Sequence, residues 1–191
     1  MGATTKFAEF IAETTPDDIP AAAFERARVL VLDAIGVALA GTREAAGEAT
    51  IRYVRELEAS PESGVIGGDF RTAAPLAALA NGTLIHALDF DDVALDWMGH
   101  PTAPVLPAAL ALGEKLHRSG REVLAAYIIG VEVESRLGSA LGLKYYELGW
   151  HATSVMGTLG AAAAAARILE LDPLRTRHAL GIAASVLQGG R

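Results

Sequence analysis

The sequence has 191 residues, 51% of them hydrophobic and 20% charged, which is typical of one folded domain rather than a disordered segment. The net charge of −7 argues against nucleic-acid affinity and attachment to anionic lipid, because both require basic surface. The absence of cysteine excludes disulfides, thiolate metal sites and a cysteine nucleophile. The first residues have no signal-peptide layout, so we expect one cytoplasmic domain over residues 1–191.

Apolar residues recur at helical spacing through most of the chain, between short breaks rich in glycine and proline. Two helix starts carry specific signals: Ser119 and Glu122 have capping-box spacing, and Asp172 stands before a first-turn proline. No segment alternates like a strand, so the predicted fold is all-α, with many helices. The expected helices span 4–13, 21–40, 43–57, 73–88, 101–117, 119–141, 152–169 and 173–188, with loops over 60–71 (extended at 65–66) and 142–150.

Residues 148–166 form an uncharged stretch about as long as a membrane span. Trp150, His151 and several hydroxyl and glycine residues interrupt it, and its second half is mostly alanine, which is only weakly hydrophobic. We therefore predict a helix buried within the protein and no membrane-spanning segment. The abundance of alanine and glycine also predicts closely packed helices around a core that contains few aromatic rings.

The segment from His86 to His100 concentrates titratable groups, with four aspartates and two histidines in 15 residues. If it were helical, Asp92 would share a face with Asp89 and with Asp96. Crowded carboxylates raise one another's pKa, and proton-transfer groups are built in this way. The alternative is a solvated loop whose aspartates cap helix starts. Composition and position leave both interpretations open.

His151 directly precedes a predicted helix, as His100 does. A helix N-terminus offers free N–H groups and partial positive charge, which can bind a carboxylate and favour a neutral imidazole. Each histidine is therefore a candidate acid or base beside a bound anion; the alternative for His151 is a packing or capping role. His86 is expected in or near the core, and His117 and His178 on the surface.

Longer motifs add a family resemblance. The run from Ala78 to Asp92, ALANGTLIHALDFDD, and the following HPTAPVLPAAL at 100–110 resemble the hallmark of the MmgE/PrpD family, as do 150–169 and 178–185. This family includes 2-methylcitrate dehydratase, cis-aconitate decarboxylase and an iminodisuccinate epimerase. The resemblance implies a cofactor-independent lyase or isomerase similar to 2-methylcitrate dehydratase. The resemblance implies a helical domain joined to a smaller α+β lid domain, usually in a dimer. It also implies small polycarboxylate substrates and neither a metal nor an organic cofactor.

By motif match, the resemblance implies that Asp89, His100 and His151 are catalytic. It places the substrate-binding side chains at Asp92, Val93, Thr102 and Thr153. The family commonly has threonine after its Asp-Asp pair, so Val93 removes one hydrogen bond to substrate. Family members are much longer, and we expect these residues to be the N-terminal part, without the lid. The cationic clamp for substrate carboxylates is not evident here, so we expect little turnover from the chain alone.

Two other functions remain as alternatives. The first is a non-catalytic helical module whose apolar faces bury a partner or a second copy of the chain. The second is a magnesium-dependent isoprenoid synthase, because Asp91, Asp92 and Asp96 imitate an aspartate-rich diphosphate motif on a helix. Against the second alternative, there is no second acidic motif and no lysine or arginine between Arg71 and Lys115 to hold diphosphate.

Overall fold

The computed structural model describes residues 2–187 and confirms the all-α prediction. Its one sheet within those residues is a two-stranded hairpin of β1 (Ser63–Gly64) and β2 (Arg71–Thr72). The helices are α1 (Ala3–Glu13), α2 (Ala21–Gly41), α3 (Ala45–Glu56), α4 (Ala74–His86), α5 (Thr102–Lys115), α6 (Gly120–Leu141), α7 (Lys144–Glu147), α8 (Ala152–Ile168) and α9 (Pro173–Ser185).

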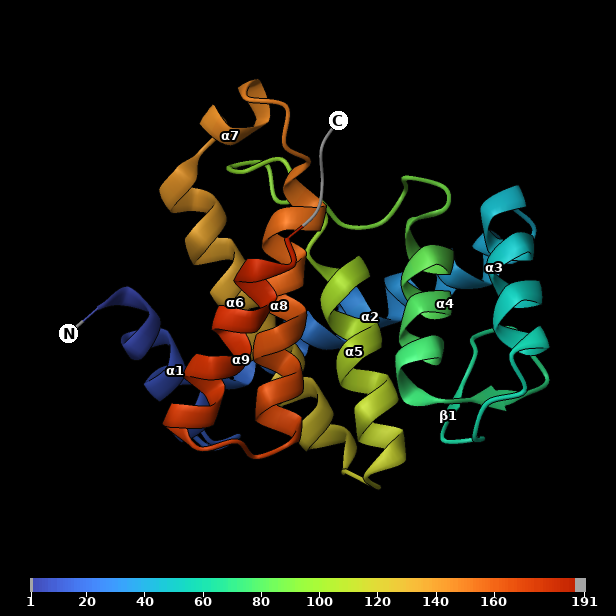
Figure 1. Ribbon diagram of the computed structural model, residues 1–191, viewed down its shortest axis with the longest axis horizontal. Coiled ribbons are helices and arrows are strands. Elements are labelled where there is room, and N and C mark those ends of the chain that lie inside the picture. The colour runs from blue at the N-terminus through green and yellow to red at the C-terminus, as the bar shows by residue number, and fades with distance from the viewer. Residues whose placement is uncertain (1, 188–191) are drawn as a thin grey trace.

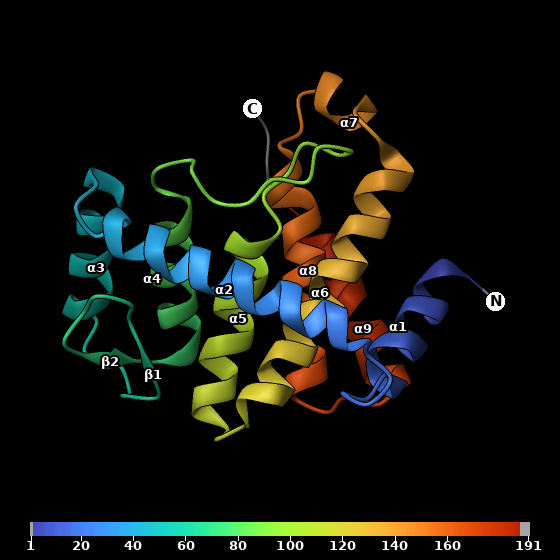
Figure 2. The same ribbon diagram turned by 180° about the vertical axis from the view of Figure 1, so that it is seen from behind.

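Four helices form the body of the molecule. α5 packs against α4 and α8, and α6 packs against α8 and α5 (Figure 1). The long α2 crosses this group on the side that faces the viewer in Figure 2 and contacts α4, α5 and α6. α1 and α9 pack together at one end of the molecule, whereas α3 and the hairpin lie at the other end (Figure 1).

Small residues bring the central helices close together, as the composition predicts. A β-carbon added to Gly130 of α6 would lie 2.7 Å from the carbonyl oxygen of Gly160 on α8 and 2.6 Å from the Val105 side chain on α5. A β-carbon on Gly157 of α8 would lie 2.4 Å from the Pro104 ring. A larger side chain at either glycine would therefore push these helices apart.

Local end signals predicted two helix starts correctly. Ser119 and Glu122 form the full capping box at the start of α6, and the Asp172 carboxylate accepts a hydrogen bond from the backbone N–H of Arg175, the third residue of α9. The prediction of an extended segment at 65–66 is wrong, because the strands are Ser63–Gly64 and Arg71–Thr72. The Ile66 N–H donates 2.8 Å to Asn81 Oδ1 of α4, so α4 holds this part of the loop, and the strand pairing lies on either side of it.

The remaining differences lie at helix ends. α4 stops at His86 and α5 starts at Thr102, so the polar segment between them is a loop rather than a helix. The short α7 occupies the middle of the expected loop over 142–150. The last helix ends at Ser185, and the expected end at Gln188 lies outside the described residues. Within the described range, no helix combines the length and apolar character needed to cross a membrane.

Candidate active site

The loop over residues 87–101 carries most of the predicted site and is fixed by a buried tryptophan. The Trp97 side chain is 0% exposed, and its backbone carbonyl accepts a 2.7 Å hydrogen bond from the Tyr145 hydroxyl of α7. Its ring packs where Gly138 of α6 has no side chain, since a β-carbon there would lie 2.5 Å from the indole. Asp89 stands in the left-handed region, with φ 52°. The shared helical face considered for the aspartates therefore does not form.

A buried aspartate joins two histidines in this loop. Asp91 Oδ1 lies 3.0 Å from His86 Nδ1, at the end of α4, and 3.3 Å from His100 Nδ1, just before α5. The Asp91 side chain is only 1% exposed. The contact with His86 is a hydrogen bond, whereas the buried His100 Nδ1 has no hydrogen-bond partner because its approach to Asp91 has poor geometry. The two imidazole rings meet edge to face, with centroids 4.7 Å apart.

The structure brings together two of the predicted catalytic residues. His100 Nε2 lies 3.3 Å from Asp89 Oδ1. His100 is mostly buried, with 18% of its side chain exposed, whereas the Asp89 side chain is 78% exposed. The exposed carboxylate is therefore placed to orient an imidazole at the edge of the protein. The backbone N–H of His100 also donates 3.1 Å to Thr153 Oγ1, which joins this loop to α8.

Asp92 and Thr102 form a separate network at the start of α5. The Thr102 N–H and hydroxyl donate to the two Asp92 oxygens at 3.2 and 2.8 Å, so Asp92 is the helix-capping aspartate that one interpretation of the sequence expected. Because the Thr102 hydroxyl donates to Asp92, the Tyr127 hydroxyl must donate to Thr102, at 2.6 Å. Thr102 is fully buried. Val93 is exposed, and the described structure gives it no polar contact.

The second predicted element is the N-terminus of α8. His151 is its capping residue, and its Nδ1 accepts a 3.4 Å hydrogen bond from the Ser154 N–H. His151, Thr153 and His86 line an open groove of about 940 Å³ whose walls come mainly from α4, α5 and α8. His151 therefore lines the same groove as His86, whose imidazole is hydrogen-bonded to Asp91.

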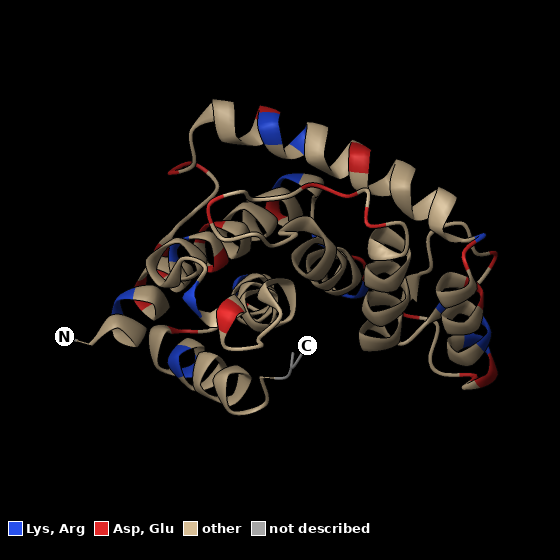
Figure 3. Cartoon of the chain, turned by 90° about the horizontal axis from the view of Figure 1, so that it is seen from above, with Lys and Arg blue, Asp and Glu red and all other residues tan. Residues whose placement is uncertain are grey.

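Hydrogen bonding and burial raise the pKa values of three groups in the site. The hydrogen bond to Asp91 raises the pKa of His86, and burial raises the pKa of Asp92 against the opposing hydrogen bonds from Thr102. Burial likewise raises the pKa of the Tyr127 hydroxyl. In Figure 3 the loop between α4 and α5 carries acidic positions and no basic ones, as the sequence requires.

A buried glutamate lies below the groove. Glu134 of α6 is 0% exposed, and neither carboxyl oxygen has a hydrogen-bond partner. Burial, followed by the charge of Asp92, raises its pKa well above the usual range. The carboxyl occupies space left by the glycines of α8, because a β-carbon on Gly160 would lie 2.8 Å from Glu134 Oε2. Gly157, which lines the groove, lies directly beside the same oxygen.

Sequence reasoning missed four residues of this arrangement: His86, Asp91, Tyr127 and Glu134. The motif that contains His86 and Asp91 was recognised, but the helix was expected to continue to residue 88. α4 instead ends at His86, and the turn that follows brings Asp91 back against it. Glu134 had a usable signal. It lies four residues from both Gly130 and Gly138, so all three share one close-packed face of α6.

The aspartate-rich motif of the isoprenoid-synthase alternative does not converge in space. Asp91 contacts the two histidines, Asp92 caps α5, and Asp96 hydrogen-bonds with Ser139 of α6. A different set of donors lies close together. One ligand atom each from His86, Asp89, Asp91 and His100 can be chosen so that all four atoms lie within 4.8 Å of one another. These are the residues of the described chain that could hold a metal ion.

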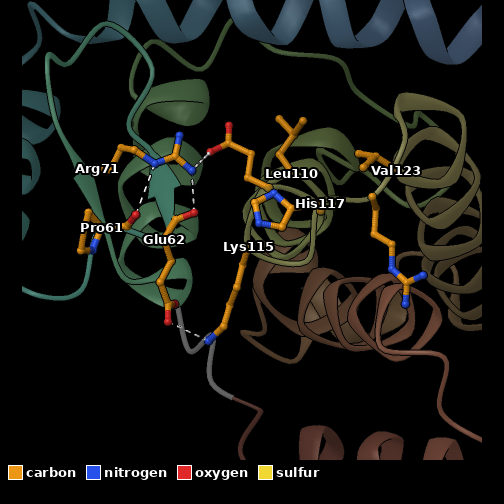
Figure 4. A pocket seen from close by; sticks show the side chains of 10 residues that line it. Pro61, Glu62, Arg71, Leu110, Lys115, His117 and Val123 are labelled. Atoms are coloured by element: carbon orange, nitrogen blue, oxygen red, sulfur yellow. Dashed lines mark hydrogen bonds and ion pairs between the residues drawn. The ribbon is translucent and has the colours of Figure 1, made fainter.

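A second cavity, of about 900 Å³, lies away from this site, between the hairpin and the end of α5 (Figure 4). Its charged side chains largely neutralise one another. Arg71 lies 3.1 Å from Glu114, and Lys115 lies 3.0 Å from Glu62. None of the predicted catalytic residues lines it. The groove at α8 is therefore the better candidate for chemistry.

Comparison with known proteins decides the family. The model of the MmgE/PrpD N-terminal domain matches residues 5–191. The chain belongs to the MmgE/PrpD family. It is 34% identical to a cis-aconitate decarboxylase-like protein of Aspergillus oryzae over 97% of this chain and 40% of that protein. It is 35% identical to cis-aconitate decarboxylase of Mus musculus, over 95% and 38%, and 37% identical to that of Homo sapiens, over 84% and 34%.

The family prediction is thus confirmed. The chain spans about 40% of the length of the curated relatives it matches. These relatives are decarboxylases or decarboxylase-like. The resemblance to a lyase family is therefore confirmed, whereas the expected likeness to 2-methylcitrate dehydratase stays a prediction.

Proposed function

We propose that these residues form the acid–base part of the active site of a lyase that acts on a small polycarboxylate, with cis-aconitate as the first candidate. The observation that carries this proposal is the pairing of His100 with Asp89 beside the α8 groove that His151 lines. The names of the relatives favour decarboxylation over dehydration. Family membership, rather than this geometry alone, supports the substrate class.

In the proposed reaction, one protonated imidazole delivers a proton to a double-bond carbon of the substrate. The bond to a carboxylate on a neighbouring carbon breaks, its electron pair forms the new double bond, and CO₂ leaves. The other imidazole returns a proton from solvent to the first, so one proton is consumed per turnover. Asp89 orients His100 and stabilises it when it is protonated, while the N-terminus of α8 beside His151 favours a nearby carboxylate. Thr153 contacts the substrate from the groove wall, and Val93 makes an apolar contact where family members commonly have threonine. Asp92 and Thr102 shape the pocket from below, through the start of α5.

The test uses the five histidines as reporters. The purified chain, with its histidine rings isotope-labelled, is titrated with cis-aconitate, and each imidazole signal is assigned from a single His→Gln variant. We expect the signals of His100 and His151 to shift together, while that of His178 on α9 stays constant. Shifts confined to His117, which lines the other cavity, or no shift at saturating ligand would contradict the proposal.

The catalytic assignment needs a second experiment in the complete enzyme that contains these residues. We expect His151→Ala to abolish release of CO₂ from cis-aconitate in the presence of a chelator, and His178→Ala to leave it unchanged. General acid–base groups of this kind contribute about 10²–10⁴-fold each. Nearly intact turnover in His151→Ala would show that another group transfers the proton.

One observation also favours the alternative of an assembly module. Large apolar side chains are exposed along α2 and on the site loop, among them Leu32 at 73%, Leu39 at 50% and Phe90 at 78%. Leu32 and Phe90 line a common small groove. We propose that a second copy of the chain covers this surface, in line with the dimer expected from the family resemblance. Sedimentation of the chain, compared with Leu32→Lys, tests this, and a monomeric parent chain would refute it.

A further inference from the structure

The loop between α4 and α5 holds negative charge that no basic side chain of the described structure neutralises. No lysine or arginine occurs between Arg71 and Lys115, and the ion pairs of Asp89 and Asp91 within residues 2–187 are made with histidines. Asp91 is almost fully buried, and burying a carboxylate is costly unless positive charge or strong donors lie nearby. A cation bound at this point would supply the positive charge that the described residues lack there.

The donor atoms have the spacing of a metal site. Metal–ligand bonds of about 2.0–2.1 Å in a tetrahedral site separate neighbouring ligand atoms by roughly 3.3–3.4 Å. His86 Nδ1 lies 3.0 Å from Asp91 Oδ1, and His100 Nδ1 lies 3.3 Å from the same oxygen. All four donors can be chosen within 4.8 Å of one another, and rotation of the exposed Asp89 side chain can shorten the wider separations.

A separate observation also points to a ligand at this place. His100 Nδ1 is buried and lacks a hydrogen-bond partner, although the Asp91 carboxylate lies only 3.3 Å away. Buried polar atoms of native proteins are nearly always satisfied, by protein, water or an ion. A metal bound to Asp91 and to His100 Nδ1 would give this nitrogen a partner and fix the orientation of the imidazole.

The donor set selects the kind of ion. Imidazole nitrogens suit zinc, cobalt, nickel and copper, whereas magnesium and calcium prefer oxygen ligands and more of them. Two imidazoles with two carboxylates match a four-coordinate zinc site. We propose that His86, Asp89, Asp91 and His100 bind one divalent transition-metal ion, with Zn²⁺ as the best match.

The bound metal would block the proposed reaction rather than take part in it. When His100 Nδ1 coordinates the metal, the one available lone pair of the neutral imidazole is used and Nε2 carries the hydrogen. The metal-bound imidazole therefore cannot accept a proton as a base. This inhibitory consequence rests on the proposed function, whereas the binding itself does not. The binding experiment therefore uses no polycarboxylate, and its failure would leave the proposed function untouched.

The test titrates the chelator-treated, purified chain with Zn²⁺ in a calorimeter, and with Co²⁺ by visible absorption, which reports tetrahedral coordination. We expect binding of one ion per chain, weakened at least about tenfold in His86→Ala and in Asp91→Asn, the range by which even supporting residues alter metal affinity. His117→Ala and His178→Ala are matched controls outside the cluster and should bind as the parent chain does. An excess of Mg²⁺ should not displace Co²⁺.

One measurement and one further variant guard against loss of folding. Circular dichroism is recorded for each protein, and His86→Gln replaces His86→Ala if the alanine variant is not helical. The absence of one-to-one Zn²⁺ binding would overturn the proposal. So would binding that is equally strong in folded His86 and Asp91 variants, because the ion would then sit elsewhere on the chain.

Discussion

The buried glutamate offers the sharpest test of how this helical body is built. Glu134 is 0% exposed, its two oxygens lack hydrogen-bond partners, and burial raises its pKa well above the ordinary value of 4.5. Its carboxyl group therefore keeps a proton in the folded protein at pH values where the unfolded chain has lost it. Folding takes up one proton at this residue, so the stability that depends on Glu134 is largest at low pH and falls as pH rises.

Replacing Glu134 by glutamine removes this proton uptake while keeping the shape of the side chain. For one proton, the equilibrium constant for unfolding changes about tenfold per pH unit, between the unfolded and folded pKa values of the group. We therefore expect Glu134→Gln to become more stable relative to the parent chain as the pH rises above the unfolded-state pKa of glutamate. The ratio of the two unfolding constants should change by about tenfold for each pH unit until the pH reaches the raised pKa of the folded state. The unsatisfied amide of glutamine adds a constant offset that does not change with pH.

The measurement is urea unfolding of both proteins, followed by circular dichroism at several pH values. Glu48→Gln, an isosteric change on the exposed surface of α3, is the control, and its difference from the parent chain should not vary with pH. A pH-independent difference for Glu134→Gln would mean that folding takes up no proton at Glu134. The argument from burial would then be wrong, and a water or backbone donor must stabilise the charged form.

Two other substitutions test the packing and the hydrogen-bond network by urea unfolding. Gly160→Ala places a β-carbon 2.8 Å from Glu134 Oε2 and should destabilise the chain by about 1–3 kcal/mol, whereas Gly181→Ala, with no atom within 4 Å, should stabilise it by up to about 1 kcal/mol. Equal effects at both glycines would contradict the close approach of α6 and α8. Tyr127→Phe removes the hydroxyl that donates to Thr102 and should cost about 1–3 kcal/mol, because the buried Thr102 oxygen loses a partner. Tyr53→Phe on the exposed face of α3 should have no measurable effect, and the same loss at both tyrosines would refute a special role for Tyr127.

The helices were predictable because their signals are local. Capping at Ser119 and Asp172 depends on hydrogen bonds within one helical turn, and the sequence contains both partners of each bond. The loop after His86 was not predictable in the same way. Its path depends on Trp97, which is buried against Gly138 of α6 and held by Tyr145 of α7, and both residues come about 40 or more positions later in the chain.

The residues of the candidate site also differ in how far the sequence could predict them. Motif resemblance named Asp89, His100 and His151. His151 lines the groove, and the Asp89–His100 pair is joined to its lining through the contacts of His100 with His86 and Thr153. Motif resemblance could not show that Asp91 links His86 to His100, because that contact exists only once α4 ends early and the chain turns back on itself. The substrate-binding role of the predicted residues stays a prediction. For Asp92 and Thr102, the hydrogen bonds between them favour a role in holding the start of α5 rather than direct contact with substrate.

The charges of the loop set the order in which the proposals are best tested. Two unit charges of the same sign about 4 Å apart repel by roughly 4 kcal/mol at an effective dielectric constant of about 20. The N-terminus of α8 offsets at most about 2 kcal/mol. A polycarboxylate beside Asp89 and Asp91 is therefore repelled more strongly than the helix attracts it, and tight binding needs protonated histidines or cationic groups beyond this loop. A divalent cation faces the opposite balance. The 191 residues should thus bind Zn²⁺ more readily than cis-aconitate, and stronger binding of cis-aconitate in metal-free buffer would show that this electrostatic argument omits a positive group.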